Sequence, residues 1–321
     1  MRLAVLSARA VDDAVYWRNV APPLEEALAS QPGATLVAAP PFRRPTFRAT
    51  MPAWLAATRT VRKADTVFWI QLNLRPAGPV WALAYVKPSA RRSALVLDPF
   101  PPILMDIPRY FRLQRLTHCF IAQRIPALYL AECTQGKTDQ NYEWLAYGFN
   151  DRVFRDQGLE RDVYAFWMGR RYASLHEALL RYCSERGLDY QYLEPPNKAI
   201  SLDELSRLSA RARYFVTVPP DVENPLRAGG TSPLTGRYLE GAGAGCRLLG
   251  VRPRSGEFEL MLPDDSLVEC ATDGSDLASV LDKADADPDF DAKASAACAH
   301  VHREHTWERR AVHIYNRLLS P

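Results

Sequence analysis

The 321-residue sequence has few features of a membrane-spanning, disulfide-rich or metal-binding protein. No apolar run approaches the roughly 18 residues that a helix needs to cross a bilayer. The six cysteines are scattered without a C-x-x-C pair, so neither a zinc site nor a disulfide framework is indicated. The opening residues 1–7 are too short for a signal peptide and are typical of a strand, which favours a cytoplasmic location.

The sequence also lacks the fingerprints of several nucleotide-binding classes. A G-x-G-x-x-G turn should follow the first strand of a dinucleotide-binding oxidoreductase, but Ser7-Ala-Arg-Ala-Val-Asp12 occupies that place. No G-x-x-x-x-G-K-[ST] segment occurs, which argues against a P-loop kinase. The basic clusters show no nucleic-acid-binding motif, so no nucleic-acid partner is expected. His300, His302 and His305 fit a solvated helix face better than a metal site.

Positive charge is concentrated in the first half of the chain. Residues 1–150 contain 18 Lys and Arg against 10 Asp and Glu, and the remainder contains 22 against 27. A basic N-terminal half favours an anionic partner or the anionic face of a membrane. Ordinary solvated helix and strand faces explain the same clusters, so both interpretations stay open.

Short apolar runs alternate with helix-length segments, a pattern typical of parallel α/β layers. The expected strands are Leu3–Ser7, Thr35–Ala38, Thr66–Gln71, Ala94–Asp98, Cys119–Ala122, Val163–Met168, Tyr190–Leu193, Tyr214–Val218, Arg247–Gly250 and Leu267–Cys270. The expected helices include Tyr16–Ala29, Leu175–Arg186, Leu202–Ala212 and Asp276–Lys283. The pattern restarts near Val163, which indicates two domains, and the helical stretch Phe290–Leu319 is expected to break near Thr306.

The segment from Thr231 to Gly250 joins a hydroxyl-rich loop, a helix start, the acidic Glu240 and a glycine-rich exit into a strand. A helix N-terminus offers unpaired N–H groups and a positive dipole end to phosphates. Glu240 could accept hydrogen bonds from two ribose hydroxyls. An ordinary capped helix with a close-packed glycine end explains the segment equally well.

Three segments carry a resemblance to a known family. Ser232-Pro-Leu-Thr-Gly-Arg-Tyr-Leu-Glu240, with its glycine-rich exit, resembles the donor-nucleotide signature of group 1 glycosyltransferases of the GT-B fold, particularly the spore-maturation glycosyltransferase-like branch. Tyr147-Gly-Phe-Asn-Asp-Arg-Val-Phe154 is similar to the interdomain connection of that family. His305-Thr-Trp-Glu-Arg-Arg-Ala311 is similar to the opening of its last helix.

The resemblance implies an α/β fold with two Rossmann-like domains facing across a cleft. Residues 1–155 would form the acceptor-binding domain, 156–305 the nucleotide-sugar-binding domain, and 306–321 a C-terminal helix that packs back on the first. The implied activity moves a sugar from a nucleotide-diphosphate-sugar, a co-substrate with no other cofactor, to a sugar, lipid-linked or other acceptor. Glycan, glycolipid, glycoconjugate or polysaccharide synthesis would fit, in the cytoplasm or at the inner face of the membrane as a peripheral protein.

Glycosyl transfer requires fixed hydrogen-bond donors near the leaving diphosphate, where negative charge develops. Met168-Gly-Arg-Arg171 follows an expected strand and resembles the phosphate loop of the family. The candidate donor-binding residues are Gly169, Arg170, Thr231, Ser232, Thr235, Arg237 and Glu240. No acidic D-x-D pair is placed for a divalent ion, so the activity is expected to be independent of metal.

The chain departs from the family pattern at two positions. Leu175 stands where many members have a lysine, and Ser232 stands where the first of two paired glutamates would lie. These departures leave the donor sugar and the stereochemical outcome open. A nucleotide-sugar epimerase or hydrolase of the same fold, or a catalytically silent nucleotide-sugar-binding partner, are the alternatives.

An inverting transferase would need a base, whereas in a retaining enzyme the leaving phosphate could deprotonate the acceptor. The candidate bases are Asp98, at the end of an expected first-domain strand, and Asp13 with its neighbour Asp12, in the turn after the first strand. Turn formation and helix capping explain each of these residues as well. His118 precedes an expected strand and would lie at the opposite edge of the sheet.

Overall fold

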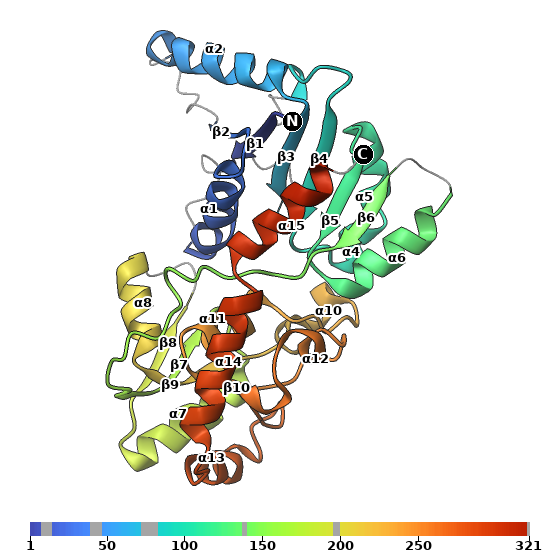
Figure 1. Cartoon of the computed structure of the whole chain (residues 1–321). Coiled ribbons are helices and arrows are strands. Elements are labelled where there is room, and N and C mark those ends of the chain that lie inside the picture. The colour runs from blue at the N-terminus through green and yellow to red at the C-terminus, as the bar shows by residue number, and fades with distance from the viewer. Residues whose placement is uncertain (8–14, 39–46, 72–82, 137–139, 195–199, 320–321) are drawn as a thin grey trace. The chain divides into compact units, whose positions relative to one another are not determined.

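The computed structural model describes residues 1–7, 15–38, 47–71, 83–136, 140–194 and 200–319. The chain divides into two compact units, shown in Figure 1. Unit 1 comprises Met1–Tyr147 and Trp307–Pro321, and unit 2 comprises Gly148–Thr306. Each unit has a parallel sheet with helices packed on it, so the fold class is α/β as the sequence predicts.

The described residues of unit 1 form a six-stranded sheet with the order β2-β1-β3-β4-β5-β6, and each neighbouring pair is parallel. Its strands are β1 (Leu3–Ser7), β2 (Ala34–Ala38), β3 (Thr66–Gln71), β4 (Arg91–Val96), β5 (His118–Ile121) and β6 (Asn141–Trp144). Every residue of β3 is buried. Helices on both faces explain why a central strand like β3 is almost continuously apolar.

Helices from both ends of the chain complete unit 1. They are α1 (Val15–Ala29), α2 (Phe47–Lys63), α4 (Pro101–Leu104), α5 (Ile107–Leu113), α6 (Arg124–Thr134) and α15 (Trp307–Leu319). Ile107, Phe111 and Leu130 from α5 and α6 share one hydrophobic core with Trp69 of β3. The C-terminal α15 packs on α1, and the Tyr315 hydroxyl donates to the Pro32 carbonyl at 2.6 Å.

Glu143 of β6 ties α15 to the sheet of unit 1. Its carboxylate accepts hydrogen bonds from His313 Nε2 and Arg317 Nε, both at 2.7 Å, and lies 3.0 Å from His118 Nε2. Burial raises the pKa of Glu143, but these hydrogen bonds lower it by a larger amount, so that the net pKa is about 2. The carboxylate therefore stays charged and holds the helix at neutral pH.

The described residues of unit 2 form a five-stranded parallel sheet with the order β11-β10-β9-β7-β8. Its strands are β7 (Val163–Met168), β8 (Tyr190–Leu193), β9 (Ala212–Thr217), β10 (Arg247–Gly250) and β11 (Leu267–Glu269). The chain runs from β7 to β8 on one side and then returns to β9 on the other side of β7. In open parallel sheets this reversal point, beyond the carboxyl ends of the strands, is where ligands bind.

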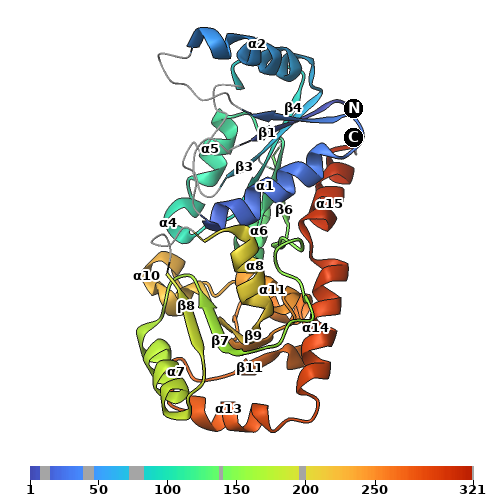
Figure 2. The same cartoon turned by 90° about the vertical axis from the view of Figure 1, so that its left-hand side faces the viewer.

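Helices cover both faces of the second sheet, as Figure 2 shows. They are α7 (Ala173–Arg186), α8 (Leu202–Ala210), α11 (Gly236–Gly243), α13 (Leu277–Asp285) and α14 (Phe290–Glu304), with the short α9 (Pro220–Glu223), α10 (Pro225–Ala228), α12 (Phe258–Met261) and the 3₁₀ turn Asp264–Ser266. Helix α11 comes so close to the sheet that a Cβ at Gly241 would lie 2.7 Å from Cγ of Phe215. The glycines of this segment therefore serve close packing as well as the turn after the helix.

The sequence pattern predicted most of these elements. All ten expected strands are confirmed, and β1, β3, β7, β8 and β10 have the expected bounds. The break in the last helical stretch is also confirmed, because α14 ends at Glu304 and α15 begins at Trp307. The short edge strand β6 was not predicted, since its polar sequence Asn141-Tyr-Glu-Trp144 shows no apolar run.

Candidate functional site

The reversal point of the second sheet lies between the loops that follow β7 and β9. Gly169 and Arg170 follow β7 directly, and α9 follows β9 and ends at Glu223. Gly169 has a φ of +118°, a conformation that residues with a side chain rarely adopt. This glycine therefore sets the path of the loop that presents Arg170.

Arg237 and Glu240 form a paired charge at the start of α11. The Arg237 guanidinium donates a hydrogen bond to Oε2 of Glu240, one turn further along the helix. Arg237 Nη1 also lies 3.7 Å from the Met168 sulfur, at the end of β7. Glu240 is only 3% exposed, and its second oxygen, Oε1, makes no hydrogen bond within the described part of the chain. The pair therefore fixes the guanidinium beside the β7 loop and leaves one carboxylate oxygen for another donor.

The hydroxyl-rich loop before α11 is held by a second loop of unit 2. The Ser232 N–H donates to Ser255 Oγ at 3.1 Å, and the Leu234 N–H donates to Glu257 Oε2 at 2.5 Å. The Thr231 hydroxyl donates to the carbonyl of Ala228 at 2.7 Å. These backbone N–H groups are thus already engaged, and the loop is rigidly placed.

Two hydroxyls of this loop, at the N-terminus of α11, make no hydrogen bond with the part of the chain that the structure describes. Thr235 is the residue that precedes the helix, but its side chain makes no capping hydrogen bond. Ser232 is 3% exposed, and neither its Oγ nor Oγ1 of Thr235 has a hydrogen-bond partner among the residues described. Buried polar atoms are rarely left unsatisfied, so an unpaired pair of hydroxyls at a helix N-terminus indicates a place for an acceptor-rich ligand.

Two charged side chains at this edge also have no partner within the described part of the chain. Arg170 is exposed and makes no hydrogen bond or ion pair with any residue that the structure describes. The same is true of the Glu223 carboxyl. Burial raises the pKa of Glu223 to about 7, and the nearby charges of Arg170, Arg237 and Arg227 oppose that increase. A group that titrates near neutral pH at a reversal point is characteristic of a functional site.

The structure brings the donor-binding candidates of the sequence together. Gly169, Arg170, Arg237, Glu240 and the loop Thr231–Thr235 all belong to the carboxyl edge of the second sheet. Their contacts with a ligand stay a prediction.

The candidate bases belong to unit 1. Asp98 follows β4, and its Oδ1 lies 3.1 Å from the Tyr147 hydroxyl. Asp12 and Asp13 lie outside the described residues.

Sequence reasoning missed Glu223, Ser255 and Glu257. The Pro219-Pro220 pair after an apolar strand marks the loop that leads to Glu223, and this pair is the feature of the sequence that could have indicated where Glu223 lies. Ser255 and Glu257 come from a loop with no motif, and only tertiary structure brings them to the loop before α11.

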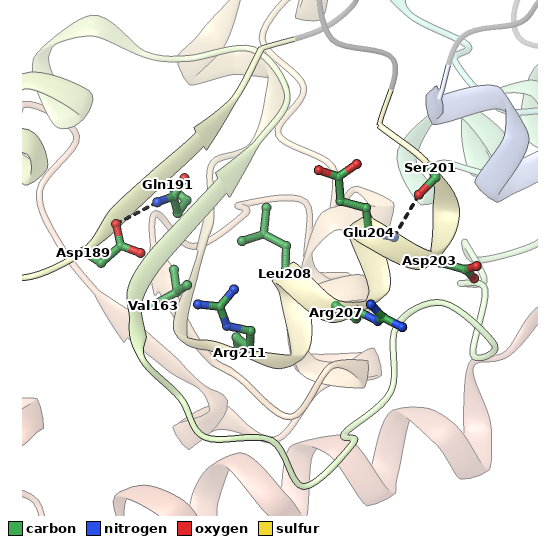
Figure 3. A pocket seen from close by; sticks show the side chains of 9 residues that line it. All are labelled: Val163, Asp189, Gln191, Ser201, Asp203, Glu204, Arg207, Leu208 and Arg211. Atoms are coloured by element: carbon green, nitrogen blue, oxygen red, sulfur yellow. Dashed lines mark hydrogen bonds between the residues drawn. The ribbon is translucent and has the colours of Figure 1, made fainter.

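A polar hollow of about 520 Å³ lies along α8, from Ser201 to Arg211, beside the first residues of β7 and β8. Figure 3 shows Val163 at the start of β7, Asp189 just before β8, and Arg207 and Arg211 at the end of α8 around it. Arg211 is paired with Asp162 at 2.5 Å and 2.7 Å. None of the residues that line the hollow belongs to the site described above.

Two further observations concern metals and membranes. Over the residues described, no group of three or more His, Cys, Asp or Glu side chains lies close enough to bind a metal ion. Over the same residues, no helix is both long and apolar enough to cross a membrane.

Comparison with protein families and known structures gives the site a context. A family model described as glycosyl transferase-like matches residues 174–316, which contain the Arg237–Glu240 pair and all of α11. No curated protein is similar enough to count as a relative. The matched segment is somewhat less than half of the chain.

Solved structures show the same fold. The pneumococcal O-GlcNAc transferase GtfA, in complex with UDP and GlcNAc, is 10% identical with a TM-score of 0.53 over 83% of this chain and 59% of its own. HepE of Anabaena, in complex with UDP and glucose, is 12% identical with a TM-score of 0.53 over 92% and 88%. AviGT4, a glycosyltransferase of avilamycin A biosynthesis, is 14% identical with a TM-score of 0.53 over 99% and 98%. This chain thus spans less than two thirds of the length of the pneumococcal transferase.

These findings show that the chain has the two-domain GT-B fold, and that part of it resembles a glycosyl transferase-like family model. The family match covers unit 2 from residue 174 onward, which includes the paired charge and the loop before α11, but not β7 or Arg170. The fold likeness extends over nearly the whole chain.

Proposed function

We propose that this protein transfers a sugar from a nucleotide-diphosphate-sugar bound at the reversal point of the second sheet. One observation carries the proposal: several groups that suit a phosphate ligand lie at one sheet edge. These groups are the Arg237–Glu240 pair, the N-terminus of α11, and Arg170 and two hydroxyls that have no partner among the residues described. Cations and a helix N-terminus bind phosphates, and a carboxylate oxygen accepts hydrogen bonds from ribose hydroxyls. The match to a glycosyl transferase-like family model over the same unit favours a sugar nucleotide among phosphate ligands.

The proposed mechanism rests on charge at the leaving group. When the bond between the sugar and the diphosphate breaks, its electron pair goes to the phosphate oxygen, which becomes more negative. Arg170 and Arg237 would stabilise that charge, together with the N–H groups and hydroxyls at the start of α11. Glu240 would orient the ribose through Oε1 while Oε2 keeps Arg237 in place. Because cations of the protein face the phosphates, we propose that no metal ion is needed.

We propose that unit 1 binds the acceptor. Its helix α5 buries Ile107 and Phe111 but exposes Arg109, Arg112 and Leu113, which is 72% exposed. A surface with exposed cations and an exposed leucine suits an anionic or lipid-linked acceptor and peripheral binding to the inner face of a membrane.

For an inverting reaction, Asp98 or Asp13 would serve as the base. Glycan or polysaccharide synthesis in the cytoplasm, and a place in the spore-maturation glycosyltransferase-like branch, belong to the same proposal.

The donor site is tested by a thermal-shift screen with UDP, GDP, TDP, CMP and their sugars, followed by titration calorimetry with the best ligand. Preferential binding to the folded protein raises its melting temperature. Arg170→Ala and Glu240→Ala should each weaken binding by about 1–3 kcal/mol, as loss of a charge-assisted hydrogen bond does. Arg207→Ala, which removes an exposed cation that lines the hollow along α8, is the matched control and should bind as the wild type does. Equal affinity in all four proteins would refute the assignment of the site.

The type of reaction is tested by following donor and products separately. A transferase forms glycosylated acceptor and free nucleotide in equal amounts across a panel of sugar, lipid-linked and anionic acceptors. Donor consumption without a glycosylated product would instead show an epimerase or hydrolase. Tight donor binding with no turnover on any acceptor would show a silent binding partner.

The membrane part of the proposal has its own assay. Sedimentation with vesicles that contain anionic lipid should bring down the wild type and less of the double variant Arg109→Ala and Arg112→Ala. Equal sedimentation of both proteins would remove α5 from the membrane proposal.

A further inference from the structure

Glu223 has no hydrogen-bond or ion-pair partner among the residues described, whereas the carboxylates near it each have one. The neighbouring carboxylates are paired: Asp221 lies 2.6 Å from Arg254 Nη2, Glu240 binds Arg237, and Glu257 accepts the Leu234 N–H. Glu223 makes no hydrogen bond or ion pair with the residues described, although it is half-buried. A carboxylate that is partly removed from water without a partner is costly, so the position favours the neutral acid.

The position of Glu223 relates it to the donor site. It ends α9, which follows β9, and Arg170 follows β7; these two strands flank the reversal point of the sheet. The charged and titratable groups that interact with Glu223 come from every element around it: Arg170 after β7, Tyr192 on β8, Arg227 on α10, and Arg237 and Tyr238 on α11. Glu223 thus shares the two arginines that the donor phosphates would use.

A charge balance shows what a bound diphosphate would do. Arg237 is paired with Glu240, and Arg254 is paired with Asp221. With Glu223 ionised, its negative charge therefore offsets the positive charge of Arg170. With Glu223 neutral, the charge of Arg170 remains for the diphosphate of a nucleotide sugar.

We propose that Glu223 meets the donor diphosphate as the neutral acid, so that binding of the nucleotide sugar takes up one proton from solvent at this carboxyl. The inference rests on the proposed function and adds to it a group that neither the sequence pattern nor the family resemblance assigns. The proton goes from water onto a carboxylate oxygen, and no bond of the ligand changes. The neutral acid can then donate a hydrogen bond to a phosphate oxygen, whereas the carboxylate would repel it.

The titration of Glu223 places this event in the neutral range. Its pKa is about 7 in the protein without ligand because burial outweighs the three arginines. Two negative charges nearby would raise the pKa further. Below pH 6 the acid is already neutral and no proton is taken up, while at pH 7.5 to 8 most molecules must bind one. Donor affinity should therefore fall by about 5–10-fold from pH 6 to pH 8.

Titration calorimetry tests the inference with UDP-glucose and UDP-GlcNAc as probes, because their diphosphate has no group that titrates between pH 6 and pH 8. Binding at pH 7.5 is measured in two buffers of different ionisation enthalpy, and the difference in heat gives the number of protons taken up. We expect roughly 0.5–1 proton per nucleotide for the wild type and none for Glu223→Gln. Glu194→Gln removes a charge from an exposed carboxylate just after β8 and should keep the wild-type uptake.

The outcomes separate this inference from the proposed function. If neither probe nor any other nucleotide sugar binds, the donor site itself is wrong. If a probe binds with the same affinity at pH 6 and pH 8 and takes up no proton, the donor site stands and the role of Glu223 is overturned. Uptake that persists in Glu223→Gln would also overturn it, because the proton would then go to another group.

Discussion

Glu223 should also affect the stability of the protein without any ligand. The pKa of this carboxyl is raised from the ordinary 4.5 to about 7 by burial, against the opposing charges of Arg170, Arg237 and Arg227. A folded state that binds a proton more tightly than the unfolded chain is most stable when that proton is present. The contribution of protonated Glu223 to the free energy of unfolding is therefore complete below pH 4.5, and it is lost as the pH rises through 7.

The size of this effect follows from the two pKa values. A difference of one in pKa corresponds to about 1.4 kcal/mol, so ionised Glu223 should lower the free energy of unfolding by about 3 kcal/mol above pH 7. Glutamine has the shape of the neutral acid and no charge. Glu223→Gln should thus equal the wild type at pH 4.5 and exceed it by about 3 kcal/mol at pH 8.5.

Urea unfolding followed by tryptophan fluorescence at pH 4.5 and pH 8.5 measures the difference, and a melting temperature higher by about 5–10 °C at pH 8.5 should accompany it. Glu194→Gln is the control, because its carboxylate is exposed at the same sheet edge. An equal effect of Glu223→Gln at both pH values would refute the argument, since only a titrating group makes the difference depend on pH. A loss of stability at pH 8.5 would show that Glu223 acts there as a useful ionised partner of the arginines.

Three further predictions concern the scaffold and the reaction. Glu143→Gln should lower the free energy of unfolding by about 2–3 kcal/mol at pH 7, because it removes a carboxylate whose pKa is about 2 and whose charge stabilises the fold. Urea unfolding should show this difference from the wild type becoming smaller as the pH falls from 4.5 towards 2, and a difference that stays constant would contradict the prediction. Gly241→Ala should lower stability in thermal unfolding by about 1–3 kcal/mol despite the better helix propensity of alanine, because its Cβ would lie 2.7 Å from Phe215 Cγ and 2.8 Å from Leu248 Cδ2; a stabilised variant would be the contrary result. Glycosyl transfer should continue unchanged in excess EDTA, measured as product formed, and loss of product restored by magnesium would contradict metal independence.

Most of the architecture was predictable because parallel sheets have a strong local signal. A buried central strand such as Thr66–Gln71 has the continuous apolar run Val67-Phe-Trp-Ile70, and it stands between helix-length segments. The break between α14 and α15 was equally visible, because the His305-Thr-Trp segment interrupts a long helical pattern. The edge strand Asn141–Trp144 was not, since an edge strand needs only one partner and has little apolar surface to bury.

The candidate site was predictable where sequence neighbours act together, as in Arg237 and Glu240, which lie one helical turn apart. It was not predictable where the decisive property is burial. Nothing in the sequence distinguishes Glu223 from Glu194, because both follow strands of the same sheet and both stand beside proline-rich turns. Only the packing around the reversal point distinguishes them, because it leaves Glu223 half-buried near Arg170 and Arg237, and it leaves Glu194 exposed. A carboxyl of this kind is recognised from its surroundings rather than from a motif, so the comparison of Glu223→Gln with Glu194→Gln tests the structure itself.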